Sequence, residues 1–237
     1  MPLDPTDAEP QSIDLGLGGT RLAGDLTVPH GAEGIVLFAH GSGSSRLSPR
    51  NRYVAGEIAA GGLATLLFDL LTPAEEERDL RTGELRFDIR LLAERLGRAT
   101  EYVRRLPETR QLAVGYFGSS TGAAAALVAA AESSDSIDAV VSRGGRPDLA
   151  GNALERVSAP TLLIVGGEDH QVIELNTRAY ERLRCDKRLE IVERATHLFE
   201  EPGTLEQVAR LARDWFVSFL AHRVGAAPLE PPQSPAP

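Results

Sequence analysis

One stretch of the chain, residues 112–131 (LAVGYFGSSTGAAAALVAAA), has the order of a strand, a sharp turn and a helix. Residues with β propensity come first, a Gly/Ser-rich turn follows, and an alanine-rich run with helical composition comes next. The pattern G-x-S-x-G places Ser120 at the corner, where the amides of a helix N-terminus point at whatever bonds to its hydroxyl. Gly118 and Gly122 suit so tight a bend. The stretch therefore predicts Ser120 as a nucleophile, with a plain Gly/Ser turn as the alternative.

The rest of the chain alternates strand-like and helix-like segments. Residues 12–28 alternate apolar and polar around a Gly-Gly pair, which predicts an antiparallel hairpin at one edge of a sheet. Such alternation predicts an α/β fold with a doubly wound, mostly parallel sheet and helices on both faces, whose ligands lie at the carboxyl ends of the strands. The other expected strands are 34–39, 63–71, 137–141, 160–165 and 189–192, and the other expected helices are 49–60, 87–106, 149–157, 172–183 and 205–220.

Three segments are expected to lie outside this alternation. The charged run at 72–86 (TPAEEERDLRTGELR) is typical of a solvated loop or the margin of a lid. Residues 225–237 hold five prolines in thirteen positions and predict a disordered tail. With an N-terminal extension at 1–11, the expected α/β domain covers residues 12–224.

Composition excludes several classes of function. A formal net charge of −9 argues against nucleic-acid or anionic-membrane partners, because both favour basic surfaces. The single cysteine, Cys185, cannot form an intrachain disulfide or a Cys-based zinc site. No run is long and apolar enough to span a bilayer, and the first residues lack signal-peptide features. We expect a soluble, cytoplasmic protein with a small-molecule substrate and no metal; the sequence leaves the oligomeric state open.

A serine nucleophile needs a histidine base and a carboxylate that orients it, and both follow later strands. Asp169 comes after the predicted strand 160–165, and His197 comes between the last predicted strand and the last helix. The order Ser120, Asp169, His197 is that of α/β-hydrolase triads. Three other acids also follow turns or strand ends and stay open as alternatives to Asp169: Asp148, Glu168 and Asp69. Three other histidines are expected at the surface: His30, His170 and His222.

The loop His40-Gly41-Ser42-Gly43-Ser44-Ser45 follows the strand at 34–39 and suits an oxyanion hole. Such a hole takes one backbone N–H from the residue after the nucleophile, here Thr121, and one from this loop. We expect Ser42 N–H as the second donor, with Gly43 or Ser44 as alternatives, and we expect His40, Gly41 and Gly43 to border the substrate. A phosphate-binding loop is the rival interpretation, but the Gly-Lys-Ser/Thr ending is missing.

Four motifs together resemble the α/β-hydrolase superfamily, in particular its dienelactone hydrolase-like branch: the elbow at Ser120, HGSGSS, GGEDHQV and ATHLFEEPG. The likeness covers roughly residues 13–220. It implies an eight-stranded sheet whose second strand is antiparallel, no large cap, and ester hydrolysis without a cofactor. It also implies Ser120, Asp169 and His197 as the triad. True dienelactone hydrolases carry a cysteine nucleophile, whereas this chain has Ser120.

The expected reaction is the hydrolysis of small carboxylic esters in an open site. Lactones or thioesters are alternative substrates, and a non-catalytic binding protein of the same fold is the alternative class. Arg143 is a candidate to receive an anionic group of the substrate, because a guanidinium forks well onto a carboxylate. An ion pair with a nearby acid is the competing interpretation. The other candidates for the anion are Arg146 beside it and, around the HGSGSS loop, Arg46, Arg50 and Arg52.

Overall fold

The structure is a computed structural model that describes residues 8–133 and 136–221. The first seven residues, His222 and the predicted tail at 225–237 lie outside the described residues. Within the described ranges, no helix is both long and apolar enough to cross a membrane.

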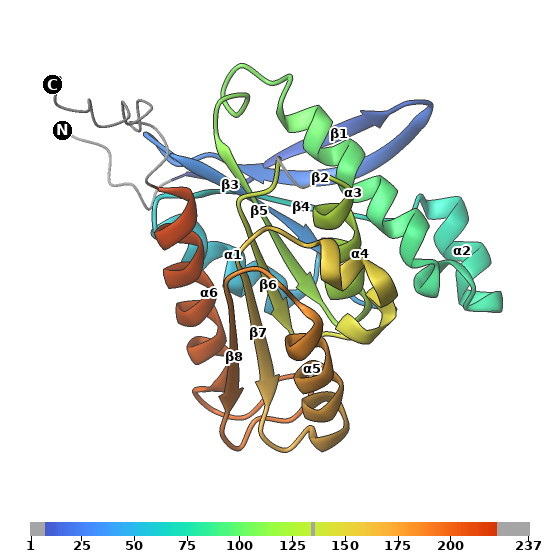
Figure 1. Ribbon diagram of the computed structural model, residues 1–237. Coiled ribbons are helices and arrows are strands. Elements are labelled where there is room, and N and C mark those ends of the chain that lie inside the picture. Colours follow the sequence, from blue (N-terminus) through green and yellow to red (C-terminus); the bar gives the residue numbers. More distant parts are fainter. Residues whose placement is uncertain (1–7, 134–135, 222–237) are drawn as a thin grey trace, which may run out of the picture.

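A single eight-stranded sheet forms the centre of the molecule (Figure 1), in the order β1-β2-β4-β3-β5-β6-β7-β8. The second strand runs antiparallel to both of its neighbours, and all other pairs are parallel. The predicted α/β class, the eight-stranded sheet and the hairpin at its edge are thus confirmed. The strands are β1 (Gln11–Leu17), β2 (Thr20–Thr27), β3 (Gly34–Ala39), β4 (Ala64–Phe68), β5 (Ala113–Ser119), β6 (Ala139–Arg143), β7 (Thr161–Gly166) and β8 (Lys187–Val192).

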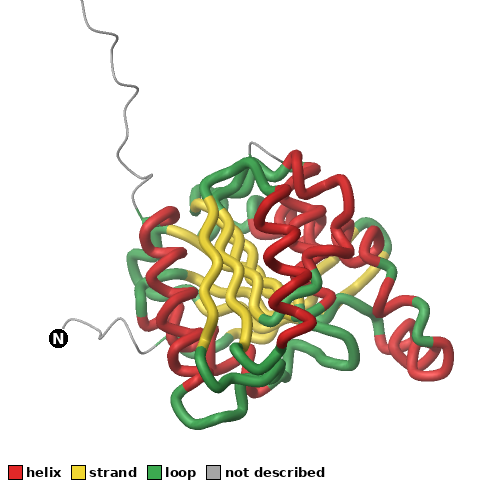
Figure 2. Tube along the Cα trace, turned by 60° about the horizontal axis from the view of Figure 1, so that its bottom comes forward, coloured by secondary structure: helices red, strands yellow, loops and turns green. Residues whose placement is uncertain are grey.

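Helices cover both faces of the sheet (Figures 1 and 2), which explains why the central strands are almost continuously apolar. Side chains alternate along β5, so Tyr116 packs in the core on the α3 and α4 side while Phe117 packs with Phe38 and Phe216 on the α1 and α6 side. The helices are α1 (Pro49–Ala60), α2 (Pro73–Thr82), α3 (Ile89–Val103), α4 (Thr121–Glu132), α5 (His170–Arg182) and α6 (Thr204–Leu220), with the 3₁₀ segments η1 (Leu85–Phe87) and η2 (Pro147–Arg156).

The expected loop at 72–86 is wrong, because most of this segment is helical. Thr72 and Glu75 form a reciprocal capping box, Pro73 occupies the first helical position, and Gly83 ends α2 in the left-handed conformation at φ 69°. The charge-run argument overlooked the T-P-x-E signal. Figure 1 shows that α2 projects from the body of the molecule.

The strand β6 ends two residues later than predicted, at Arg143. Arg143 pairs with Ser119 of β5 and with Ile164 of β7, so it is the last residue of a central strand rather than part of a loop. Arg143 as a whole residue is only 7% exposed. The connection to β7 contains just η2, as expected of a fold without a large cap, and η2 is kinked at Gly151.

Candidate active site

Ser120 lies at a strained corner between β5 and α4. Its φ of 51° and ψ of −120° are unfavourable for a residue with a Cβ atom. A Cβ atom on Gly122 would lie 2.1 Å from the carbonyl oxygen of Ala39, and one on Gly118 would lie 2.4 Å from Cα of Ala123. Only glycine fits at these two positions, so the local sequence dictates the sharp turn that presents the serine.

Asp169 and His197 form a close hydrogen-bonded pair. Asp169 precedes α5 in the loop after β7, and His197 lies in the loop after β8. The distance from His197 Nδ1 to Asp169 Oδ2 is 2.6 Å. An ionised carboxylate only accepts hydrogen bonds, so Nδ1 carries the proton and Nε2 is left as an acceptor. The side chain of Asp169 is 15% exposed and that of His197 is 40% exposed. The largely buried carboxylate therefore orients the imidazole, while the imidazole itself stays accessible to solvent.

The other candidate acids have different partners or none near His197. Asp148 accepts two hydrogen bonds from Arg146, at 2.9 and 2.8 Å. Asp69 binds Arg46, and Glu168 is exposed. Of the four acids considered, only Asp169 contacts the histidine.

The last residue of β6 and the residue after it lie between the serine and the histidine. The backbone N–H of Ser120 donates to the carbonyl of Arg143 at 3.3 Å. At the next residue, Gly144, a Cβ atom would lie 3.1 Å from the carbonyl oxygen of His197 and 3.6 Å from its Cε1. Ser120 and His197 thus both lie next to the dipeptide Arg143-Gly144. No hydrogen bond joins Ser120 Oγ to His197 within the described residues; such bonds are often long in unliganded enzymes and tighten with substrate.

The HGSGSS loop packs directly on the elbow. A Cβ atom on Gly41 would lie 3.0 Å from Cβ of Ser120, and Ser42 Oγ lies 3.1 Å from Thr121 Oγ1. In the described part of the chain, the backbone N–H groups of Ser42 and Thr121 donate no hydrogen bond. Two unused donors on either side of a serine, one of them at the N-terminus of α4, can stabilise a developing oxyanion.

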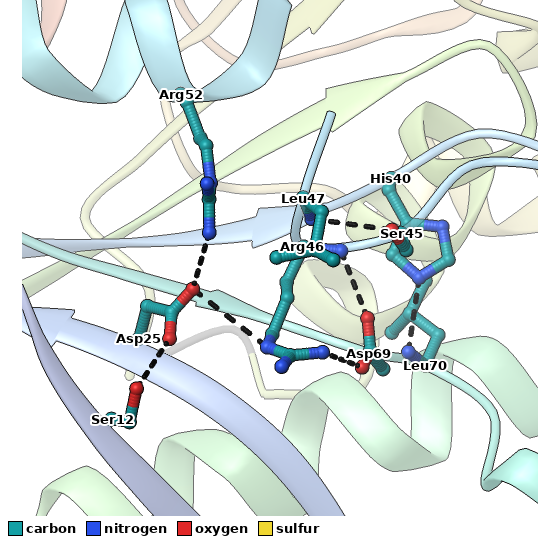
Figure 3. A network of polar contacts seen from close by, with 9 residues as sticks. All are labelled: Ser12, Asp25, His40, Ser45, Arg46, Leu47, Arg52, Asp69 and Leu70. Atoms are coloured by element: carbon teal, nitrogen blue, oxygen red, sulfur yellow. Dashed lines mark hydrogen bonds and ion pairs between the residues drawn. The ribbon is translucent and has the colours of Figure 1, made fainter. Parts of the chain in front are cut away.

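His40 holds this loop to the end of β4 (Figure 3). Its Nε2 accepts a hydrogen bond from the N–H of Leu70 at 3.0 Å, and Nδ1 lies 3.1 Å from the carbonyl of Gly41. Both ring nitrogens are engaged by backbone, so His40 borders the site mainly as a support. Burial lowers the pKa of His40, against the opposing effects of the Gly41 carbonyl and the carboxylates of Asp69 and Glu76.

Arg46 fastens the far end of the loop. Its backbone N–H and Nη1 donate to the two carboxylate oxygens of Asp69, at 2.9 and 2.6 Å. Asp25 also lies near Arg46 and accepts a hydrogen bond from Arg52 at 3.1 Å (Figure 3). Sequence reasoning named Asp69 and Arg46 separately, as a candidate acid and a candidate anion receptor, and missed that they bind each other. A separation of 23 residues with no local pattern left no signal for the pairing.

We expect acid to destabilise the fold through His40. The neutral ring is favoured in the folded protein, whereas the unfolded chain takes up a proton near the ordinary pKa of about 6.5. Stability is therefore fully present above that pH and is lost as the pH falls below it. Urea unfolding at pH 7.5 and 5.5 should show a smaller pH effect for His40→Gln than for the wild type. His170→Gln, at an exposed position, is the matched control; an equal change in both variants would contradict the assignment.

A pocket lies beside the HGSGSS loop and extends to α2. Several residues of the segment 72–86 line this pocket, so the segment forms one of its walls. Among them, Leu80 of α2 is 73% exposed. No cluster of three or more His, Cys, Asp or Glu side chains suited to a metal ion occurs in residues 8–133 and 136–221. The lining also includes Ser42, Asp69, Leu70, Leu71, Asp79, Arg86, Leu92 and Thr121.

The sheet order and the strained elbow define an α/β hydrolase. The chain belongs to the dienelactone hydrolase family, whose model matches residues 23–222. A crystal structure of a dienelactone hydrolase from Anabaena variabilis is 61% identical with a TM-score of 0.87, covering 90% of this chain and 99% of the other. The family and this relative support a hydrolase.

More distant structures share the fold alone. Est1E from Butyrivibrio proteoclasticus is 14% identical with a TM-score of 0.73, covering 87% of this chain and 98% of the other. A dienelactone hydrolase-like promiscuous phosphotriesterase, P91, from metagenomic libraries is 20% identical with a TM-score of 0.71. The match covers 89% of this chain and 98% of the other.

Two curated proteins of Mycobacterium tuberculosis, from strains CDC 1551 and H37Rv, carry the provisional name of a phosphoribosyl transferase. Each is 58% identical over 210 residues, which are 89% of this chain. The aligned region is only 46% of each relative, so this chain spans about half of their length.

Proposed function

We propose that the protein is a serine hydrolase that cleaves small carboxylic esters through an acyl-enzyme. The observation that carries the proposal is the 2.6 Å hydrogen bond between Asp169 and His197, on loops that border the elbow of Ser120. The unused N–H groups of Thr121 and Ser42 would stabilise the oxyanion.

In the first half of the reaction, Ser120 Oγ attacks the ester carbonyl and its proton passes to Nε2 of His197. Asp169 keeps the proton on Nδ1 and stabilises the imidazolium that forms. The tetrahedral intermediate collapses, the bond to the alcohol oxygen breaks, and His197 gives its proton to the departing alkoxide. Ser120 is left acylated.

In the second half, a water molecule replaces the alcohol. His197 takes one proton from the water as its oxygen attacks the acyl carbon, and the same two N–H groups bind the oxyanion again. Collapse breaks the bond to Ser120 Oγ, which recovers its proton from His197. The carboxylic acid leaves, and the enzyme returns to its starting state.

Lactones and thioesters would follow the same steps, so the chemistry alone does not separate them from open-chain esters. The phosphoribosyl transferase name belongs to the mycobacterial relatives, of which this chain covers about half, whereas the family model that this chain itself matches is that of a hydrolase. The cytoplasmic location stays a prediction.

A fluorophosphonate probe tests the proposal. We expect one equivalent of phosphonate on the wild-type protein, located at Ser120 by peptide mass spectrometry, because only an activated serine attacks the phosphorus centre. Ser119→Ala, which removes the neighbouring buried hydroxyl, should still be labelled, and Ser120→Ala should not. Labelling at a serine other than Ser120, or none in a folded protein, would contradict the proposal.

A further inference from the structure

The loop that carries His197 lies at the edge of the sheet. It follows β8, which has a neighbouring strand on one side only. Within residues 8–133 and 136–221, the imidazole makes a single hydrogen bond, to Asp169. One hydrogen bond sets the direction of the ring but does not hold the loop. The position of the imidazole therefore depends on how the backbone around His197 is held.

Glu201 holds the residue directly before His197. Its two carboxylate oxygens accept hydrogen bonds from the backbone N–H and the hydroxyl of Thr196, at 3.0 and 2.7 Å. The hydrogen bonds from the Thr196 hydroxyl and N–H keep the pKa of Glu201 below its ordinary value, so the carboxylate is ionised near neutral pH and only accepts. Bonds to a charged acceptor are stronger than bonds between neutral groups. Because Thr196 is exposed, burial does not hold it in place.

Glu201 is itself attached to the last helix. Its carbonyl accepts hydrogen bonds from the backbone N–H and the hydroxyl of Thr204, the first residue of α6, at 3.1 and 2.7 Å. Thr204 is buried, and α6 packs against the central strands. Glu201 thus connects an exposed loop to a buried helix. We call Thr196, Glu201 and Thr204 the Glu201 clip.

Between the two ends of the clip the chain makes a tight turn. The N–H of Phe199 donates to the carbonyl of Thr196 at 3.2 Å, which places His197 and Leu198 at the centre of the turn. Phe199 is buried and has a φ of 56°, a left-handed conformation that persists only where the surroundings hold the residue. The core therefore holds one end of the turn through Phe199, and Glu201 holds the other end through Thr196.

The neighbouring carboxylate has a different partner. Glu200 accepts a hydrogen bond from Nη1 of Arg50 in α1 at 3.1 Å. No hydrogen bond or ion pair joins Glu200 to Thr196 or His197 in the residues that the structure describes. Glu200 and Glu201 carry the same charge one residue apart, so Glu200 is a matched control for the effect of charge alone.

We propose that Glu201 is a positioning residue for His197, which holds the turn so that the imidazole reaches both Asp169 and Ser120. Without the bonds to Thr196, the turn would be free to carry His197 away from its 2.6 Å contact with Asp169. A displacement of about 1 Å in a catalytic site can lower a rate about a hundredfold. The inference rests on the proposed ester hydrolase and adds a residue that acts through the base without touching the substrate.

Proton NMR reports on His197 without turnover. The Nδ1 proton in the short bond to Asp169 should give a signal far downfield, which is assigned by its loss in His197→Gln. Glu201→Ala should shift or broaden this signal, because the turn is released, whereas Glu200→Ala should leave it unchanged. An unchanged signal in Glu201→Ala would overturn the proposal.

Kinetics give a second readout. Glu201→Ala should lower kcat for p-nitrophenyl butyrate by about tenfold or more, the usual range for hydrogen bonds to a charged group, with a much smaller change in KM. Thr196→Val removes only the hydroxyl and should cause a smaller loss. The double variant should lose no more than Glu201→Ala, because both changes remove the same contact. Additive losses, or a change in KM alone, would overturn the proposal.

Conservative variants distinguish the hydrogen bonds from the charge. Glu201→Gln keeps both bonds, because the amide oxygen accepts from the N–H of Thr196 and the amide nitrogen donates to its hydroxyl. Thr196→Ser keeps the hydroxyl. Both variants should retain most of kcat. A loss in Glu201→Gln as large as that in Glu201→Ala would assign the effect to charge and overturn the proposal.

Thermal unfolding separates positioning from stability. A lower Tm of Glu201→Ala with an unchanged NMR signal and unchanged kcat would show a purely structural role and overturn the proposal. Ser120-dependent hydrolysis that Glu201→Ala leaves intact would overturn the positioning role alone. If the wild type hydrolyses no ester although Glu201→Ala still shifts the His197 signal, the ester hydrolase fails and the positioning of His197 by Glu201 stands.

Discussion

Replacing Ser120 with alanine is expected to lower kcat for ester hydrolysis by about a millionfold, because the acyl-enzyme cannot form. The oxyanion donors stay in place, so a small residual rate above that of water should persist. Stopped assays with p-nitrophenyl butyrate at high enzyme concentration would measure it. The variant should fold as well as the wild type, since alanine at φ 51° bears the same backbone strain as serine.

Retention of more than about one per cent of wild-type kcat by Ser120→Ala would contradict a nucleophilic role. Circular dichroism and thermal unfolding should accompany the assay, so that loss of activity is not confused with loss of fold.

Replacing Asp169 with asparagine is expected to lower kcat by about ten-thousandfold. The amide can donate a hydrogen bond to Nδ1 of His197, which places the ring proton on Nε2 and leaves no acceptor for the proton of Ser120. The affinity for substrate should change far less, so the loss should appear in kcat rather than in KM.

The matched control is Glu168→Gln, at the adjacent, exposed residue of the same turn. It removes one negative charge from the loop without touching His197 and should leave kcat close to that of the wild type. Comparable losses in the two variants would assign the effect to loop charge rather than to the hydrogen bond with Asp169.

The sequence was sufficient wherever a local pattern fixed the geometry. The elbow at Ser120 needs glycine on both sides, and the glycines at 118 and 122 made it visible without a structure. Asp169 and His197 could be placed by chain order, because the carboxyl ends of parallel strands share one edge of the sheet. Their contact with each other became visible only in three dimensions.

Other features depended on pairing between distant segments. Arg143 was expected to follow the end of the strand at 137–141, whereas its backbone pairing with β5 and β7 makes it the last residue of that strand. The bond between Arg46 and Asp69 is equally non-local. Helix α2 is different, because its capping box can be recognised in the sequence. The charged residues of the segment were interpreted as a solvated loop, and the capping box was overlooked.

The order of the sheet places the proposed nucleophile and the proposed base after strands of unequal stability. Ser120 follows β5, which has a neighbouring strand on either side, whereas His197 follows β8, which has one on a single side only. Outermost strands open more readily than interior ones. Under mild denaturing conditions we therefore expect the proposed catalytic base to be displaced while the proposed nucleophile is still held by an intact part of the sheet, so that inactivation precedes unfolding of the core.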